Sequence, residues 1–340
     1  MSLNEHQLAD WRDKAMRFED SVAHAVVGQS RVIHLITLAL FARGHIMLEG
    51  DVGVGKTTLL RAVARGLGGA FERVEGTVDL LPGDLLYHTY IDELGKPNIA
   101  PGPLLKQGED LAVFFFNEIN RARPQVHALL LGVMAERRVN AFNREFRLPH
   151  LQVFADRNRV EQEETFEIPS AARDRFMLEL SVEIPADAET QRALLFDTRF
   201  HDVDGLVESV EPGVLDYREM TCVCRQIQAF VEASPALGDY ARRLWHATRD
   251  PQAVGVRIDG VDMPHLIKAG SSPRGMSLML QAARVQAWLA GRNYLLPEDV
   301  HLVFAAAIAH RIFLNPVYEL RRDALILPLM QGILGQVATP

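Results

Sequence analysis

The sequence predicts an α/β domain built on a parallel sheet, followed by a smaller domain that is entirely helical. Residues 45–66 have the pattern of a short apolar strand, a glycine-rich turn and a helix. Residues 111–116 form a continuous apolar run, as expected of a central strand that is covered on both faces. Beyond Pro185 the pattern is predominantly helical. We therefore expect an α/β domain over residues 1–184 and a helical domain over residues 185–340.

The other elements of the first domain follow in order along the chain. Residues 5–44 carry apolar side chains near helical spacing and break at Val27-Gly28-Gln29, which predicts two helices. Asp79–Asp84 predicts the start of a helix, and residues 87–103 predict a small hairpin that turns near Gly95. Strands are expected at 45–48, 71–75, 111–116 and 151–155, and helices at 57–66 and 124–137.

Composition narrows the class of protein. The chain has 340 residues, 48% of them hydrophobic and 24% charged, which is ordinary for a soluble globular protein. The net charge of −8 argues against a dedicated nucleic-acid binder, which usually presents a strongly basic face. The first twenty residues lack the apolar core of a signal peptide, and the longest apolar run, 32–41, is too short to cross a bilayer. We expect a cytoplasmic protein without membrane insertion.

The most informative motif is a phosphate-binding loop. Residues 50–57 match G-x-x-x-x-G-K-[ST] at every specified position, between the expected strand and the expected helix. Glycine lets backbone N–H groups curl around phosphate oxygens, Lys56 can reach the β- and γ-phosphates, and Thr57 can offer its hydroxyl to Mg²⁺. The predicted phosphate-binding residues are Gly50, Asp51, Val52, Gly53, Val54, Gly55, Lys56, Thr57 and Thr58.

Asn117-Glu118 ends the apolar strand at the place where P-loop ATPases carry a metal-binding acid and a catalytic carboxylate. We predict that Glu118 polarises the attacking water. Asn117 stands where aspartate usually holds the Mg²⁺ shell; its amide oxygen can still accept from a metal-bound water, but one negative charge is lost. A weaker Mg²⁺ requirement or slower turnover is the expected consequence.

Three further polar residues are candidates for the same site. Asn158 follows the strand 151–155 and could hold the attacking water or the γ-phosphate, although asparagine is also a common turn former there. Arg175 precedes the domain boundary, where it could reach a neighbouring subunit's nucleotide. Arg274 follows Ser272-Pro273, an N-cap and first helical residue that would hold it against a phosphate. A single arginine is, on its own, more often a solvated charge.

Taken in this order, these residues resemble AAA+ ATPases, and among them the MoxR family. Ile119-Asn120-Arg121 and Met134-Ala135-Glu136-Arg137 are similar to the stretch that follows Walker B in that family. Asp79–Asp84 and Glu161-Gln162-Glu163 also look like its signatures, so that the resemblance covers roughly residues 20–315. It implies an AAA+ αβα domain followed by a helical lid.

The resemblance also implies roles for single residues. Glu118 corresponds to the Walker B glutamate, Asn158 to sensor 1, Arg175 to the arginine finger and Arg274 to sensor 2. Val27 and Gly28 lie in a segment that looks like the adenine contact. The expected hairpin falls where the family carries its helix-2 insert. The implied substrate and metal are ATP and Mg²⁺.

MoxR proteins resemble chaperones that activate or assemble a client protein complex, frequently a metalloenzyme, with a partner carrying a von Willebrand factor A domain. The resemblance is nearest to the methanol-oxidation branch, whose client is methanol dehydrogenase, and it implies a homo-hexameric ring. Two alternatives stay open. Asn117 favours a nucleotide-gated assembly module with little turnover, and the shared core would also allow a nucleic-acid remodelling ATPase, which the acidic composition disfavours.

Overall fold

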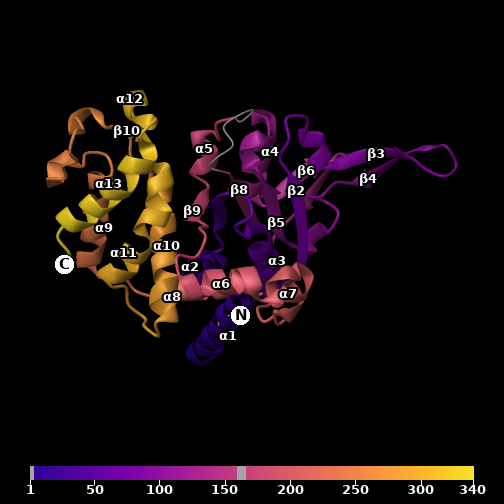
Figure 1. Ribbon diagram of the computed structural model, residues 1–340, viewed down its shortest axis with the longest axis horizontal. Helices are drawn as coiled ribbons and strands as arrows, with labels where there is room; N and C mark the ends of the chain where they lie inside the picture. The colour runs from indigo at the N-terminus through magenta and orange to yellow at the C-terminus, as the bar shows by residue number, and fades with distance from the viewer. Residues whose placement is uncertain (1–3, 159–165) are drawn as a thin grey trace.

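The sheet at the centre of the first domain has five parallel strands in the order β2-β5-β8-β1-β9. The computed structural model describes residues 4–158 and 166–340 (Figure 1), so Glu161-Gln162-Glu163 lies outside the described residues. The parallel sheet is as predicted, and β9 is a strand that the sequence pattern did not reveal. The strands are β1 (His45–Glu49), β2 (Ala70–Glu75), β5 (Leu111–Asn117), β8 (Gln152–Arg157) and β9 (Phe176–Ser181).

Helices cover both faces of this sheet, and strand residues alternate between the two apolar layers. Val113 and Phe115 pack into the layer that contains α3, whereas Phe114 and Phe116 pack into the layer that contains α4. The period of two residues in a strand produces this division, and it fixes which way each residue at a strand end faces. The covering helices are α1 (Glu5–Ala25), α2 (Ser30–Phe41) and α3 (Lys56–Leu67) on one face and α4 (Pro124–Glu136) on the other.

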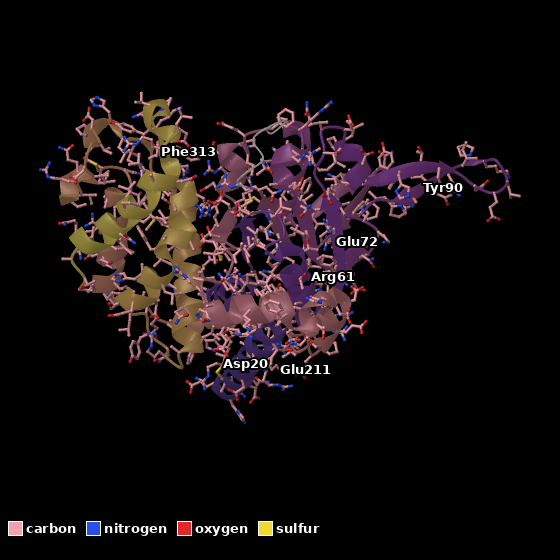
Figure 2. The ribbon with its side chains drawn as sticks, in the orientation of Figure 1. Asp20, Arg61, Glu72, Tyr90, Glu211 and Phe313 are labelled. Carbon is pink, nitrogen blue, oxygen red and sulfur yellow. The ribbon has the colours of Figure 1, made fainter. Side chains whose placement is uncertain are left out.

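Two hairpins extend from this core. The expected one, β3 (Tyr87–Ile91) with β4 (Pro97–Pro101), is antiparallel and projects from the side of the sheet opposite to the C-terminal helices (Figure 1). Figure 2 shows Tyr90 on this projection. The second, β6 (Arg138–Ala141) with β7 (Arg144–Arg147), was not predicted. The expected helix start near residue 79 forms only a single 3₁₀ turn, η1 (Pro82–Leu85), because the chain then enters β3. The other short turns here are η2 (Gly108–Asp110), η3 (Ile119–Arg121) and α5 (Ser170–Arg173).

The chain after β9 is mainly helical, as expected, with one small antiparallel pair added, β10 (Ile267–Ala269) with β11 (Phe313–Leu314). The segment around α7 packs against the first domain: the Arg65 guanidinium of α3 donates to the Val210 carbonyl at 2.8 Å. The domain boundary at residue 185 remains a prediction. The helices are α6 (Ala188–Phe196), α7 (Val203–Ser209), α8 (Met220–Phe230), α9 (Pro235–Ala247), α10 (Pro273–Leu289), α11 (Pro297–Ile308), α12 (Pro316–Glu319) and α13 (Arg322–Gln336), with 3₁₀ turns η4 (Thr198–His201), η5 (Gln252–Val254), η6 (Met263–His265) and η7 (Ala309–Arg311).

Acidification should destabilise this core through His45, at the start of β1. Its buried Nδ1 accepts from the Val153 N–H at 2.9 Å, and its Nε2 donates to the Met134 carbonyl at 3.1 Å, so the bonding requires a neutral ring. Burial, with the nearby charge of Arg137, lowers the pKa of His45 to about 3. Only the unfolded chain, with a pKa near 6.5, then takes up a proton between these two values.

The stability that His45 contributes is therefore fully present above pH ~6.5 and is lost as the pH falls towards 3, by about 1.4 kcal/mol per pH unit. Urea unfolding at about pH 7 and about pH 5.5 measures this loss. The His45→Gln variant should show a shallower pH dependence than the parent by that amount. The same slope in both proteins would contradict the assignment.

Within residues 4–158 and 166–340, no helix has the length and apolar character needed to cross a membrane.

Candidate active site

The loop between β1 and α3 has the backbone shape that phosphate binding requires. Gly53 and Gly55 adopt φ values of +82° and +88°, in the left-handed region that glycine accepts without strain, and both are open to space where a Cβ would lie. Gly55 is the N-cap of α3, so the N–H groups of the first helical turn, including those of Thr57 and Thr58, lie at this opening. Asp51 and Val52 are exposed at the rim, and Val54 is half-buried.

Lys56 connects the loop to the two central strands. Its Nζ donates to the Gly50 carbonyl at 2.6 Å and to Oδ1 of Asn158 at 2.8 Å, and it lies 3.2 Å from Oδ2 of Asp156. Only 8% of the Lys56 side chain is exposed. The ammonium group is therefore held by oxygen atoms at the carboxyl ends of β1 and β8, where ligands bind in open parallel sheets.

Glu118 follows β5, and its carboxylate lies beside the Asn158 side chain that bonds Lys56. Its Oε1 accepts from Nδ2 of Asn158 at 3.0 Å, and its Oε2 pairs with Nη1 of Arg121 at 2.9 Å. The residue has φ +54°, a left-handed conformation that is uncommon outside glycine and occurs preferentially at functional sites. The structure thus joins three predicted residues into one chain of hydrogen bonds, from Lys56 through Asn158 to Glu118.

Asp156 is a site residue that we did not predict. Its Oδ1 accepts from the Glu118 N–H at 2.6 Å while its Oδ2 pairs with Lys56, so one buried carboxylate holds both the backbone of Glu118 and the side chain of Lys56. Burial raises the pKa of Asp156, and Lys56 opposes that rise. The alternation of side chains along β8 could have indicated this residue. Asp156 lies two residues after Phe154, so both face the apolar layer that contains α3.

The predicted metal ligands fit a hard divalent cation. Thr57 lies in the first turn of α3, and Asn117 ends β5 on the face that α3 covers. Hydroxyl, amide and carboxylate oxygens are the donors that Mg²⁺ prefers. Nδ2 of Asn117 donates to Oε1 of Glu75 at 3.0 Å, which brings a second carboxylate to this edge of the sheet.

The two predicted arginines lie elsewhere in the subunit. Arg175 directly precedes β9, and Phe176 pairs with His45 whereas Ser181 pairs with Glu49, so Arg175 is at the opposite end of the strand from the phosphate-binding loop. That separation is roughly 17 Å along the strand. Nη1 of Arg175 donates to the Ala171 carbonyl at 2.8 Å.

Arg274 is held beside Asp174, the residue before Arg175, rather than beside Lys56. Its Nη1 lies 3.4 Å from Oδ2 of Asp174, and Ser272, the N-cap of α10, donates its hydroxyl to Oδ1 of Asp174 at 2.7 Å. The N-cap at Ser272 is as predicted. Asp174 precedes β9 at the end remote from this subunit's own loop, and the phosphate contact of Arg274 remains a prediction.

The proposed adenine segment lies at the junction that follows β9. Nε2 of Gln29 donates to the Glu183 carbonyl at 2.6 Å, which joins the loop between α1 and α2 to the segment that follows β9. Val27 is half-buried and Gly28 is exposed beside it.

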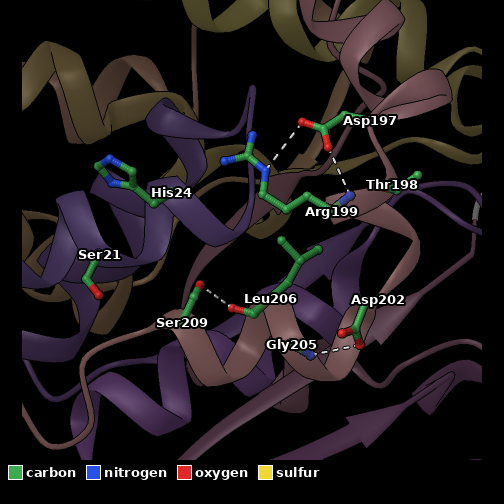
Figure 3. Close-up of a pocket in the computed structure, with 9 residues that line it drawn as sticks. All are labelled: Ser21, His24, Asp197, Thr198, Arg199, Asp202, Gly205, Leu206 and Ser209. Atoms are coloured by element: carbon green, nitrogen blue, oxygen red, sulfur yellow. Dashed lines mark hydrogen bonds and ion pairs between the residues drawn. The ribbon is translucent and has the colours of Figure 1, made fainter.

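A cavity of about 670 Å³ between α1 and α7 is separate from this site (Figure 3). Its polar groups serve local structure: Asp202 accepts from the Gly205 N–H at 2.9 Å as the cap of α7, and Asp197 caps the turn at Arg199. None of the predicted nucleotide-binding residues is among the residues that line it, which are Ser21, His24, Asp197, Thr198, Arg199, Asp202, Gly205, Leu206 and Ser209.

A phosphate-binding loop on a five-stranded parallel sheet, a strand-end glutamate bonded to an asparagine on the next strand, and a helical C-terminal region together define an AAA+ type P-loop ATPase fold. Residues 45–178 match the family described as ATPase family associated with various cellular activities (AAA), and residues 265–327 match the AAA lid domain. A crystal structure of a presumed ATPase from Cytophaga hutchinsonii is similar, with a TM-score of 0.85, 27% identity and coverage of 99% of this chain and 98% of that one.

The chain is 60% identical over 333 residues to Protein MoxR of Methylorubrum extorquens, covering 98% of this chain and 97% of the relative. It is 53% identical over 333 residues to Protein MoxR of Paracoccus denitrificans, with 98% of each covered. Chaperone MoxR1 of Mycobacterium tuberculosis is 32% identical over 296 residues, covering 86% of this chain and 74% of that one. The chain belongs to the MoxR family of AAA+ ATPases.

Lys56→Ala should destabilise the fold as well as remove a phosphate ligand. It would leave Asp156, 1% exposed, without its counter-charge, and breaking a buried pair in this way costs about 3 kcal/mol. Lys56→Ala with Asp156→Asn should recover most of that loss in urea unfolding without recovering nucleotide binding. The control is Arg17→Ala, which breaks a pair with Glu211 whose side chains are 61% and 51% exposed, so that it contributes ~0–1 kcal/mol. Equal losses in the two single variants would contradict the prediction.

Proposed function

We propose that this protein hydrolyses ATP in a homo-hexameric ring and uses the cycle to activate or assemble a client protein complex. The observation that carries the proposal is the hydrogen-bonded chain from Lys56 through Asn158 to Glu118, beside an open phosphate-binding loop. A lysine for the phosphates, a carboxylate for the water and an amide that orients both are the parts that phosphoryl transfer to water needs.

In this mechanism the loop N–H groups and Lys56 hold the β- and γ-phosphates, and Glu118 accepts a proton from the attacking water. Asn158 keeps the Glu118 carboxylate aimed, since its amide bonds both Lys56 and Glu118. Thr57 and Asn117 would hold Mg²⁺, which when bound neutralises charge on the phosphates. Glu118 must first leave Arg121, which occupies its second oxygen at 2.9 Å.

The position of the arginines supports a ring. Arg175 and Arg274 both lie near the end of β9 that is remote from their own loop, so we expect the nucleotide that they contact to belong to a neighbouring subunit. An arginine supplied in this way stabilises charge that develops on the transferred phosphoryl group. The ring size of six rests on family membership.

The client and the partner are proposed from the similarity of this chain to other MoxR proteins. The M. tuberculosis relative is named a chaperone, and the 60% identity to Protein MoxR of M. extorquens favours the methanol-oxidation branch. We propose a metalloenzyme such as methanol dehydrogenase as client, a partner with a von Willebrand factor A domain, and a cytoplasmic location. The β3–β4 hairpin, with Ile91 and Leu94 74% and 80% exposed, is the segment we expect to meet the client.

Steady-state ATP hydrolysis measured against protein concentration, with native mass alongside, tests the proposal. Activity that rises cooperatively as rings form would support a shared active site. Absence of nucleotide binding would overturn the proposal. ATP binding and ring formation without turnover would instead favour the second candidate function, a nucleotide-gated assembly module, which the neutral side chain of Asn117 favours.

A further inference from the structure

We propose that Glu75 supplies the negative charge that Asn117 lacks, so that the two residues together do what one aspartate does in other P-loop ATPases. The inference rests on the proposed function, because it concerns the Mg²⁺ that accompanies ATP. It assigns a role to a residue on β2, one strand away from the catalytic glutamate.

The two side chains are joined at the ends of neighbouring strands. Glu75 and Asn117 are partners in the parallel pairing of β2 with β5, and Nδ2 of Asn117 donates to Oε1 of Glu75 at 3.0 Å. An amide nitrogen can only donate to a carboxylate, so this bond fixes the amide and leaves its Oδ1 to accept from another group. Asn117 is only 8% exposed, so the group that donates to its Oδ1, or the cation that binds it, must lie within the site and not in bulk solvent.

The chain beyond Glu75 keeps this contact close to the catalytic segment. The Gly76 N–H donates to the Asn117 carbonyl at 2.7 Å, which continues the pairing past the strand. A Cβ at Gly76 would lie 2.1 Å from the Glu118 carbonyl oxygen, so a larger residue would push β2 away from β5. Position 76 therefore needs glycine for Glu75 to remain at the site.

Both side chains lie on the face of the sheet that α3 covers. Val113 and Phe115 belong to the apolar layer of α3, and Asn117 continues the same alternation. The Arg73 guanidinium lies over the Phe115 ring at 5.8 Å, which places the odd-numbered residues of β2, Glu75 included, on that face. Thr57, the predicted Mg²⁺ ligand, is in the first turn of α3.

Glu75 is available to a cation because its other contact is weak. Its Oε2 pairs with Arg73 at 3.0 Å, but these side chains are 54% and 39% exposed, and water screens the attraction in such a pair. A divalent cation bound at Asn117 would compete for the same carboxylate at low cost.

The same geometry alters what an aspartate at position 117 would do. Its carboxylate would replace the donor of the 3.0 Å bond and face Glu75 directly, and two like charges that close disfavour each other. Asn117→Asp alone should therefore lower the melting temperature in EDTA. Adding Glu75→Gln should restore it, because the pair again has one donor and one carboxylate.

Mn²⁺ binding to the protein–ADP complex, titrated by electron paramagnetic resonance, tests the inference without using turnover. Glu75→Gln should weaken Mn²⁺ binding by about tenfold, the loss typical of a residue that supports metal ligands. Glu75→Gln with Asn117→Asp should return the affinity to that of the parent. The control is Glu72→Gln, on the same strand but bound to Lys106 and Gln107, which should leave Mn²⁺ affinity unchanged.

Unchanged Mn²⁺ affinity in Glu75→Gln would overturn the inference. So would a loss that Asn117→Asp does not recover, since position 75 would then act through local structure and not through its charge. ADP binding in EDTA separates this test from the proposed function. If ADP fails to bind with and without metal, the proposed function and the inference both fail, whereas normal ADP binding with an unaltered metal affinity overturns the inference alone.

Discussion

Arg175→Ala should lower the rate of ATP hydrolysis by about 10³-fold or more while leaving ATP binding and ring formation intact. The reason is positional: Arg175 precedes β9 at the end remote from its own loop, so we expect it to contact a neighbour's nucleotide and not that of its own subunit. Within the subunit its Nη1 bonds only to the Ala171 carbonyl among the described residues, so its removal should disturb the fold little. Single-turnover hydrolysis in assembled rings measures the effect.

Arg242→Ala is the matched control, since Arg242 is 62% exposed and its Nε lies 3.7 Å from Asp239 on the surface of α9. It should hydrolyse ATP at the parent rate. If Arg175→Ala also does so, Arg175 is not the arginine finger.

Glu118→Gln should lower hydrolysis by about 10²- to 10⁴-fold, the range typical of losing a general base. Glutamine keeps the length of the side chain and an oxygen for the Asn158 amide, but it cannot take up the proton of the attacking water. ATP should therefore accumulate bound to the protein, which a filter-binding assay of radiolabelled ATP would detect.

The control for Glu118→Gln is Glu136→Gln, which makes the same chemical change in an exposed pair with Arg138. Undiminished turnover in Glu118→Gln would remove Glu118 from the mechanism.

Mixing the two inactive chains distinguishes a shared site from a site within one subunit. In a mixed ring, a loop from the Arg175→Ala chain retains Glu118 and can receive Arg175 from a Glu118→Gln neighbour. Activity should therefore reappear in the mixture although neither chain is active alone. A mixture as inactive as its components, despite proven exchange of subunits, would show that both residues act within one chain.

Much of the core could be predicted because its strands are short apolar runs between clear turns, as in 111–116. The hairpin β6–β7 was missed because half of its strand residues are charged and most are exposed. Its turn at Phe142 and Asn143 also uses positive φ values of 52° and 56° without glycine. β9 was missed because Glu179 interrupts its apolar pattern, although its carboxylate pairs with Arg157 at 3.3 Å.

The site was predictable where a motif or a strand end marked it, as for Lys56, Glu118 and Asn158. Asp156 was not predicted, because its importance depends on a buried pair with a lysine a hundred residues earlier. The placement of Arg274 also depends on tertiary structure, since Asp174 meets it across a hundred residues of sequence. Local pattern identifies the residue types at a site, but the contacts between distant segments decide which of them meet.

The buried Arg311 has a mechanical consequence. Its guanidinium bonds the Asp174 carboxylate at 3.2 Å, the Asp174 carbonyl at 3.0 Å and the Phe176 carbonyl at 2.6 Å. The helical region therefore holds the segment that carries Arg175, and a rotation of that region would shift Arg175 with it. In the proposed ring, the nucleotide state of one subunit would then control when its Arg175 reaches the nucleotide of the neighbouring subunit. Hydrolysis would therefore proceed from one site to the next in order.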